Sequence, residues 1–255
     1  MFSLNKYNIN KSSKKIILPF QILVGTHHKT GTIWLFTIFQ KIADLYGLNI
    51  HHNLDPRDSN SFDILFNDQG AFNLELIKKP YKGIHIIRDP RDIIVSSAFY
   101  HQKSDEAWLH IPRAEFNGMT YQEKIKSLGS LDEQILFEME NSSKKTIFNI
   151  LNWNYNNENF FEVKYENLIE DTSMNIFREI FCFLGFPQII ISEVIDIAYS
   201  NSLFSGQVSN TEHVRSGKTK QYKKYFKKIH KEKFQNIFGD ALIKLGFEKS
   251  PTKAT

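Results

Sequence analysis

The chain has 255 residues, of which 41% are apolar, including 22 phenylalanines, and this composition supports a sizeable core and excludes a disordered protein. Its net charge of +4 suits an anionic ligand but is too small for a dedicated DNA- or RNA-binding protein, so no nucleic-acid partner is expected. The one cysteine, Cys182, excludes a disulfide framework and a thiolate-rich metal site, and its apolar neighbours predict a small core residue.

Residues 1–15 are polar and lysine-rich and precede no cleavable apolar segment, so they predict a flexible N-terminal arm rather than a secretion signal. No run of eighteen apolar residues occurs, so we expect no membrane span. These features predict a soluble, cytoplasmic protein. Residues 16–250 are expected to form a single domain, because no linker or repeat divides them.

The first predicted strand, Gln21–Val24, is a short apolar run. A helix is predicted from Thr32 onward, because apolar residues recur there at every third or fourth position. A turn of small residues with a lysine, Lys29, joins the two. The start of a helix offers unpaired N–H groups, and the lysine adds a full positive charge. This stretch therefore predicts an anion-binding loop.

Later segments continue the alternation of strands and helices. Strands are predicted at residues 48–52, 62–66, 84–88 and 160–164, with a turn at 55–58 and a final glycine-stopped helix between residues 226 and 247. Such alternation predicts an α/β fold in three layers, with a central parallel sheet between helices.

The loop reads Thr26-His27-His28-Lys29-Thr30-Gly31-Thr32-Ile33-Trp34. It resembles the 5′-phosphosulfate loop of sulfotransferases that use 3′-phosphoadenosine 5′-phosphosulfate (PAPS), which usually reads Thr-Tyr-Pro-Lys-Ser-Gly-Thr-Thr-Trp. Its lysine precedes the second glycine, unlike the lysine of the Walker A loop. The resemblance implies a P-loop NTPase-like sulfotransferase fold, with PAPS as cofactor and 3′,5′-adenosine bisphosphate (PAP) as product.

The same resemblance implies a role for each residue of the loop. Lys29 is expected to stabilise the bridging oxygen and the leaving 5′-phosphate, where negative charge grows. Trp34 is expected to stack on the adenine, or alternatively to anchor the first helix in the core. The remaining donors to the phosphate are expected to be Thr30, Gly31, Thr32 and Ile33.

A second motif, Arg88-Asp-Pro-Arg-Asp-Ile-Ile-Val-Ser96, places a serine eight residues after an arginine, across a proline turn. It resembles the site where these sulfotransferases bind the 3′-phosphate of the cofactor. A guanidinium group and a hydroxyl can both donate to one phosphate.

Two further stretches extend the resemblance. Tyr165, in Lys164-Tyr-Glu-Asn-Leu168, matches a tyrosine that lies near the nucleotide in the family. The stretch Arg215-Ser216-Gly217 resembles the loop that closes over the 3′-phosphate, although Ser216 stands where lysine is usual. Eight lysines fall between Lys218 and Lys233, and they form either an electrostatic funnel for an anionic ligand or a solvated helical face.

The general base is the least defined part of the predicted site. Many family members place a histidine after the third strand, but this chain has none there. The candidates are Asp68, which follows that strand, and His101 and Glu106, which follow the second motif. No metal is expected, because no spacing of ligands points to one.

The sequence therefore predicts an enzyme that moves a sulfuryl group from PAPS to a hydroxyl or amine of a small-molecule or carbohydrate acceptor. Two alternatives stay open. One is a P-loop nucleotide kinase or NTPase, and the other is a catalytically inactive module that binds PAP or a polyanion.

Overall fold

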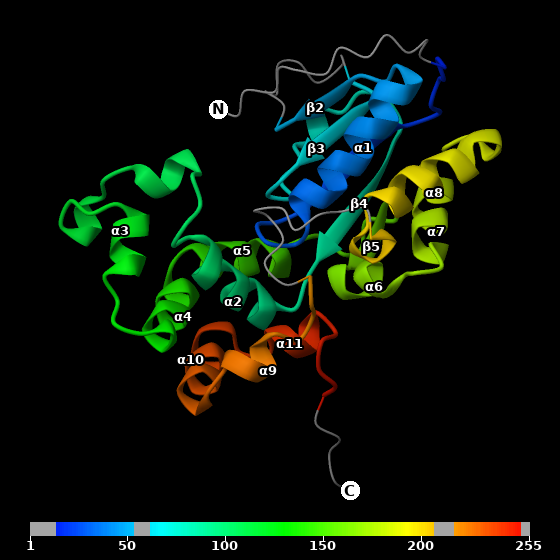
Figure 1. Cartoon of the computed structure of the whole chain (residues 1–255). Helices are drawn as coiled ribbons and strands as arrows, with labels where there is room; N and C mark the ends of the chain where they lie inside the picture. Colours follow the sequence, from blue (N-terminus) through cyan, green and yellow to red (C-terminus); the bar gives the residue numbers. More distant parts are fainter. Residues whose placement is uncertain (1–13, 54–61, 207–216, 251–255) are drawn as a thin grey trace, which may run out of the picture. The chain divides into compact units, whose positions relative to one another are not determined.

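The computed structural model describes residues 14–53, 62–206 and 217–250 (Figure 1). These residues form two compact units. The sheet unit comprises the described parts of Asn8–Arg88 and Trp153–Lys218, and the helical unit comprises Asp89–Asn152 and the described part of Thr219–Thr255. The predicted turn at 55–58 and most of the predicted N-terminal arm lie outside the described residues, and a single domain over 16–250 stays a prediction.

Five parallel strands form the sheet unit's centre, in the order β2-β3-β1-β4-β5. Parallel strands end at the same edge of a sheet, so the loops that follow them lie together. Their order and direction confirm the predicted α/β fold with a central parallel sheet. The strands are β1 (Gln21–Gly25), β2 (Ile50–His52), β3 (Ile64–Asn67), β4 (Tyr81–Ile87) and β5 (Phe160–Lys164).

Alternate residues of each strand face opposite sides of the sheet. On one side, Ile22 and Val24 of β1 and Ile84 of β4 are buried in the core that α1 and α8 cover (Figure 1). On the other side, Leu23 and Phe160 pack in a second cluster. The helices of this unit are α1 (Thr32–Tyr46), α6 (Tyr165–Glu170), α7 (Asn175–Phe183) and α8 (Ile191–Ser200), with short 3₁₀ turns at Leu74–Leu76, Gln188–Ile190 and Leu203–Ser205.

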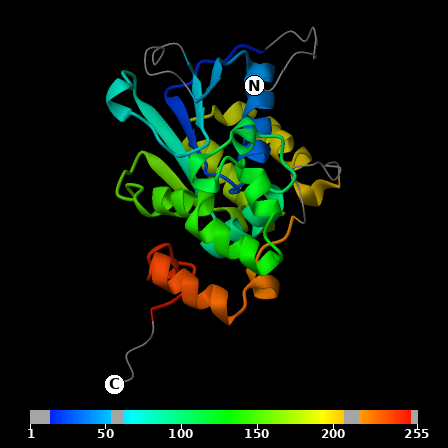
Figure 2. The ribbon, with the colours of Figure 1, turned by 90° about the vertical axis from the view of Figure 1, so that its left-hand side faces the viewer.

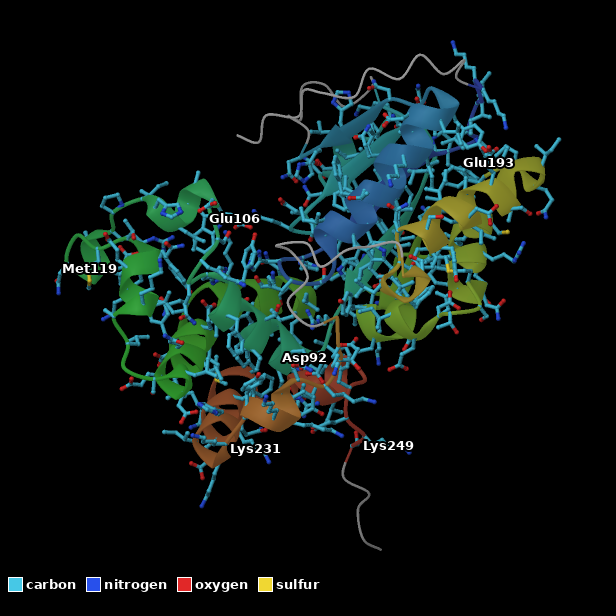
Figure 3. The ribbon with its side chains drawn as sticks, in the orientation of Figure 1. Asp92, Glu106, Met119, Glu193, Lys231 and Lys249 are labelled. Atoms are coloured by element: carbon cyan, nitrogen blue, oxygen red, sulfur yellow. The ribbon has the colours of Figure 1, made fainter. Side chains whose placement is uncertain are left out.

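The helical unit joins two segments that are far apart in the sequence. The C-terminal α10 packs on α4 (Figures 1 and 2). The backbone N–H of Tyr222 donates at 2.9 Å to Oδ1 of Asp92, which is labelled in Figure 3, and this bond ties α9 to α2. Its helices are α2 (Pro90–Tyr100), α3 (Tyr121–Lys126), α4 (Leu131–Glu140), α5 (Ser142–Leu151), α9 (Tyr222–Tyr225), α10 (Lys228–Phe238) and α11 (Ala241–Lys244), with 3₁₀ turns at Ala107–His110 and Ala114–Phe116.

Two expectations from the sequence need correction. The final helix predicted between residues 226 and 247 is divided into α10 and α11, because Gly239 ends α10. A separate short helix, α9, precedes it and ends at the extended Phe226. Cys182 is exposed rather than buried. It directly follows Phe181 on α7. The buried positions of this helix, Phe177, Ile180 and Phe181, share one face at helical spacing, and position 182 lies on the opposite side. No described helix has the length and apolar character needed to cross a membrane.

Candidate functional site

The loop between β1 and α1 is held by hydrogen bonds that centre on the backbone of His27. The carbonyl oxygen of His27 accepts from Thr30 N at 3.0 Å, from Thr30 Oγ1 at 2.8 Å and from Thr32 Oγ1 at 3.0 Å. The His27 N–H lies 2.8 Å from Thr30 Oγ1, and Thr26 Oγ1 lies 3.0 Å from Thr32 Oγ1. These bonds fix the shape of the loop between Thr26 and Thr32.

Two residues of the loop have left-handed backbone conformations. Lys29 has a φ of 65° and Gly31 a φ of 96°. Gly31 is the N-cap of α1 and has no side chain with which to cap it, so the first N–H groups of the helix are not occupied by a capping side chain. Such a helix start, preceded by a lysine, suits a phosphate or sulfate group.

The guanidinium of Arg88 lies beside this loop. Arg88 directly follows β4 and is 8% exposed, and its Nη1 donates to the carbonyl oxygen of Lys29 at 2.8 Å. Its guanidinium carbon lies 4.5 Å from the ring centre of Tyr165. The same ring would lie 3.1 Å from a Cβ atom on Gly31. Lys29, Gly31, Arg88 and Tyr165, which the sequence predicted from three separate motifs, therefore meet in the sheet unit.

Trp34, on the first turn of α1, is half-buried. Its ring packs edge-on against Tyr165, with centroids 6.2 Å apart, and against Phe177, with centroids 5.7 Å apart. These contacts join the helix to the core. Stacking of Trp34 on adenine stays a prediction.

The other predicted cofactor residues differ in burial and in the unit to which they belong. Ser96 is half-buried on α2, in the helical unit, and Gly217 belongs to the sheet unit. Thr30 is buried, whereas Ile33 is 50% exposed. Arg215 and Ser216 lie outside the described residues. The roles of all these residues stay predictions.

Asp68 lies in the turn after β3 and is partly exposed, with Oδ2 3.6 Å from Nε2 of His52. Its backbone N–H donates to the side chain of Asn53. Among the described residues, this contact with His52 is the ion pair recorded for the Asp68 carboxylate.

His101 is completely buried at the end of α2, and its Nδ1 lies 2.6 Å from Oε1 of Glu138, which is also completely buried. Glu138 accepts further hydrogen bonds from Tyr121 at 3.0 Å and from Ser143 at 2.9 Å. Burial and the charge of Glu138 raise the pKa of Tyr121 above its usual range. Buried polar groups need hydrogen-bond partners, and among the described residues Glu138 has three. Its carboxylate therefore holds the His101 ring in one orientation.

Glu106, in the helical unit (Figure 3), accepts from the hydroxyl of Tyr100 at 2.9 Å and from the indole of Trp108 at 2.5 Å. Burial and the charge of Glu106 raise the pKa of Tyr100 to about 12. Asp68, His101 and Glu106 thus have three different environments, and the choice of general base among them stays a prediction.

The structure also contains a polar network that sequence reasoning did not assemble. His27 of the loop, His85 of β4 and Glu162 of β5 form a hydrogen-bonded row across the second face of the sheet. Its members lie far apart in sequence and meet through strand register, which pairs Gly25 with His85 and His85 with Glu162. One signal was visible: His85 is a polar residue inside a buried apolar strand.

An open hollow of about 580 Å³ lies on the sheet unit beside the segment that follows Gly70. The residues that line it are Ala71, Phe72, Asn73, Leu74 and Glu75. Among the described residues, no group of three or more histidine, cysteine, aspartate or glutamate side chains is arranged to hold a metal ion.

A family model described as the sulfotransferase domain matches residues 67–246. The fold is similar to that of mouse sulfotransferase SULT7A1 in complex with PAP, at 16% identity and a TM-score of 0.55, over 91% of this chain and 86% of that chain. It is also similar to retinol dehydratase in complex with androsterone and the inactive cofactor PAP, at 14% identity and a TM-score of 0.53, over 89% and 82% of the two chains. A search of curated protein sequences gave no match.

Proposed function

Because this chain belongs to the sulfotransferase domain family, we propose that it moves a sulfuryl group from PAPS to a hydroxyl or amine of a small-molecule or carbohydrate acceptor and releases PAP. The observation that supports this proposal most directly is that the loop around Lys29 meets Arg88 and Tyr165 in the sheet unit. Residues 25–34 lie outside the range that the family model matches, so the loop is independent support for the same function.

In the reaction, the acceptor oxygen or nitrogen forms a bond to sulfur while the bond between sulfur and the bridging phosphate oxygen breaks. Lys29 would neutralise the charge that grows on the 5′-phosphate, and the N–H groups at the start of α1 would donate to the same oxygens. Arg88 and Ser96 would bind the 3′-phosphate, and Gly217 with its neighbours Arg215 and Ser216 would complete that part of the site.

The direct test is transfer of radiolabelled sulfate from PAPS to a panel of phenols, alcohols, amines and oligosaccharides, with magnesium and radiolabelled ATP as the rival donor. Label on an acceptor and release of PAP are expected from PAPS alone. Transfer of phosphate from ATP would support a kinase instead. PAP binding without transfer to any acceptor would support an inactive binding module.

A further inference from the structure

In the row of His27, His85 and Glu162, the donor and the acceptor of each hydrogen bond can be assigned. Nδ1 of His85 lies 2.6 Å from Oε2 of Glu162, and Nε2 of His85 lies 2.8 Å from Nε2 of His27. An ionised carboxylate only accepts hydrogen bonds, so Nδ1 of His85 carries a proton. If His85 is neutral, its Nε2 is an acceptor, and Nε2 of His27 must then donate to it.

This assignment leaves the lone pair of His27 on Nδ1. That atom is buried and has no hydrogen-bond partner among the described residues. Buried polar atoms are normally paired, and an unpaired one points to a partner that arrives with a ligand. His27 is also the residue whose carbonyl organises the loop, two positions before Lys29.

The surroundings hold the row in place. The ring of Trp153 stacks on His85, with centroids 4.0 Å apart at 16°, and its indole donates to Oε1 of Glu162 at 2.6 Å. Gly70 packs against His27 so closely that a Cβ there would lie 2.8 Å from the ring. Tyr155 also faces His85 edge-on. Burial and the charge of Glu162 raise the pKa of Tyr155.

We propose that His27 accepts the proton of the acceptor group, and that His85 and Glu162 are positioning residues that pass this proton on. The acceptor proton moves to Nδ1 of His27 while the proton on Nε2 of His27 moves to Nε2 of His85. His27 stays neutral and changes tautomer, and the resulting imidazolium of His85 is paired with the carboxylate of Glu162. The proton then leaves to solvent by way of Glu162, whose side chain is 28% exposed.

This route fits the low basicity of His27. Burial, and secondarily the charge of His85, lower the pKa of His27 to about 3. A histidine with that pKa does not hold a second proton at neutral pH. It can still transfer a proton, because it gives up one proton as it receives another. The inference rests on the proposed sulfuryl transfer, and it adds His27 to the candidates Asp68, His101 and Glu106.

The test uses the full chain with His27→Gln and Glu162→Gln. Glutamine at position 27 can still donate to His85 but cannot take up a proton, and glutamine at 162 still accepts from Trp153. The matched control is Glu193→Gln, since Glu193 is a partly exposed carboxylate that accepts from Tyr46 at 2.5 Å, on α8 (Figure 3). PAP binding is followed by the shift in melting temperature.

Turnover is compared for para-nitrophenol, which is largely ionised near neutral pH, and para-methoxyphenol, which is not. With His27→Gln we expect turnover of para-methoxyphenol to fall by about 10²-fold or more, the worth of a general base. Turnover of para-nitrophenol should fall by less than about threefold, since that acceptor needs no base. Glu162→Gln should give a smaller loss in the same pattern, and all three variants should keep the PAP shift.

Equal losses on both phenols, or loss of the PAP shift, would make the row structural and overturn the proposal. Failure of the wild-type protein to bind PAP would instead reject the proposed sulfuryl transfer. If the wild type binds PAP but turns over neither phenol, nitrogen NMR of isotope-labelled histidines in the PAP complex decides the matter. A lone pair on Nδ1 of His27 at neutral pH supports the relay, and a proton there overturns it.

Discussion

Lys29 carries the positive charge of the loop and one of its two left-handed backbone conformations. A non-glycine residue at a φ of 65° is uncommon, and such conformations occur where the surrounding structure enforces them, often at functional sites. Replacing Lys29 by alanine keeps a Cβ atom but removes the ammonium group. We expect Lys29→Ala to lower turnover by about 10²-fold to 10³-fold, as loss of a group that stabilises developing charge does.

The measurement is transfer from saturating PAPS, with Lys78→Ala as the control. Lys78 lies in the same unit, and its Nζ contacts only the nearby carbonyl oxygen of Glu75 among the described hydrogen bonds. Turnover of Lys29→Ala within threefold of the wild type would remove Lys29 from the chemistry.

Substitution of Arg88 tests the proposed binding site for the 3′-phosphate. Its planar guanidinium reaches the Lys29 carbonyl and stacks over Tyr165, and lysine can reproduce neither the fork nor the stacking. We expect Arg88→Lys to weaken PAP binding by about tenfold or more, measured by titration calorimetry. Arg178→Lys, on the exposed side of α7, should leave the affinity unchanged. Equal affinities of the two variants would contradict the assignment.

His27 gives the molecule a pH dependence whose sign can be derived. Burial lowers the pKa of His27 from 6.5 to about 3, so below pH 6.5 the unfolded chain binds a proton that the folded chain excludes. Stability is therefore lost as pH falls from about 6.5 toward about 3, and nothing is lost above this range. From pH 7 to pH 5 the contribution of this group should fall by about 2 kcal/mol.

Urea unfolding at the two pH values measures this loss. His27→Gln removes the titrating group and should show a correspondingly smaller change between the two conditions. Identical changes in the wild type and the variant would mean that His27 titrates alike in both states.

At the scale of elements, the tight passage from β1 into α1 depends on Gly31. A side chain there would adopt a φ of 96° and place its Cβ 3.1 Å from Tyr165. Gly206 is the matched control, because its φ is 71° but nothing lies within 4 Å of an added Cβ. Gly206→Ala should lower the free energy of unfolding by about 1 kcal/mol, from the backbone conformation alone.

Gly31→Ala should cost more, about 2 kcal/mol, and should also weaken PAP binding, because the displaced Tyr165 ring stacks on Arg88. Chemical denaturation and calorimetry measure the two effects. Equal destabilisation by both alanines would show that the contact with Tyr165 is not tight.

The positions of the strands and the start of α1 follow from local patterns in the sequence. Apolar runs such as Gln21–Val24 and the helical spacing after Thr32 need no long-range information, so the bounds of β1 and the first residue of α1 were predicted close to those observed. Arg88 was placed correctly at the end of a strand for the same reason.

What the sequence did not reveal depends on register between distant segments. His85 meets His27 only because β4 pairs with β1, and it meets Glu162 only because β5 pairs with β4. His101 finds Glu138 across 37 residues. No spacing in a single sequence encodes such partners, so the network around His27 was missed and the environment of His101 was unforeseen.

For the whole molecule, the proposed site makes the melting temperature selective among nucleotides. PAP carries both the 5′-phosphate that Lys29 is proposed to bind and the 3′-phosphate that Arg88 is proposed to bind. AMP lacks the 3′-phosphate. ATP with magnesium also lacks it and carries its charge on the 5′-triphosphate. A ligand present at a hundred times its Kd stabilises the folded state by about 2.7 kcal/mol. For a chain of this size that corresponds to a shift of several degrees.

We therefore expect PAP to raise the melting temperature by several degrees, AMP to raise it much less at the same concentration, and ATP with magnesium to have little effect. The shift should diminish as salt rises, because charge attracts the ligand to a basic chain and salt screens that attraction. Arg88→Lys should reduce the response to PAP and leave the response to AMP unchanged, since only PAP has a 3′-phosphate to lose. A shift with ATP and magnesium alone would contradict the sulfotransferase assignment and favour the kinase, because only a kinase site requires the triphosphate and its metal.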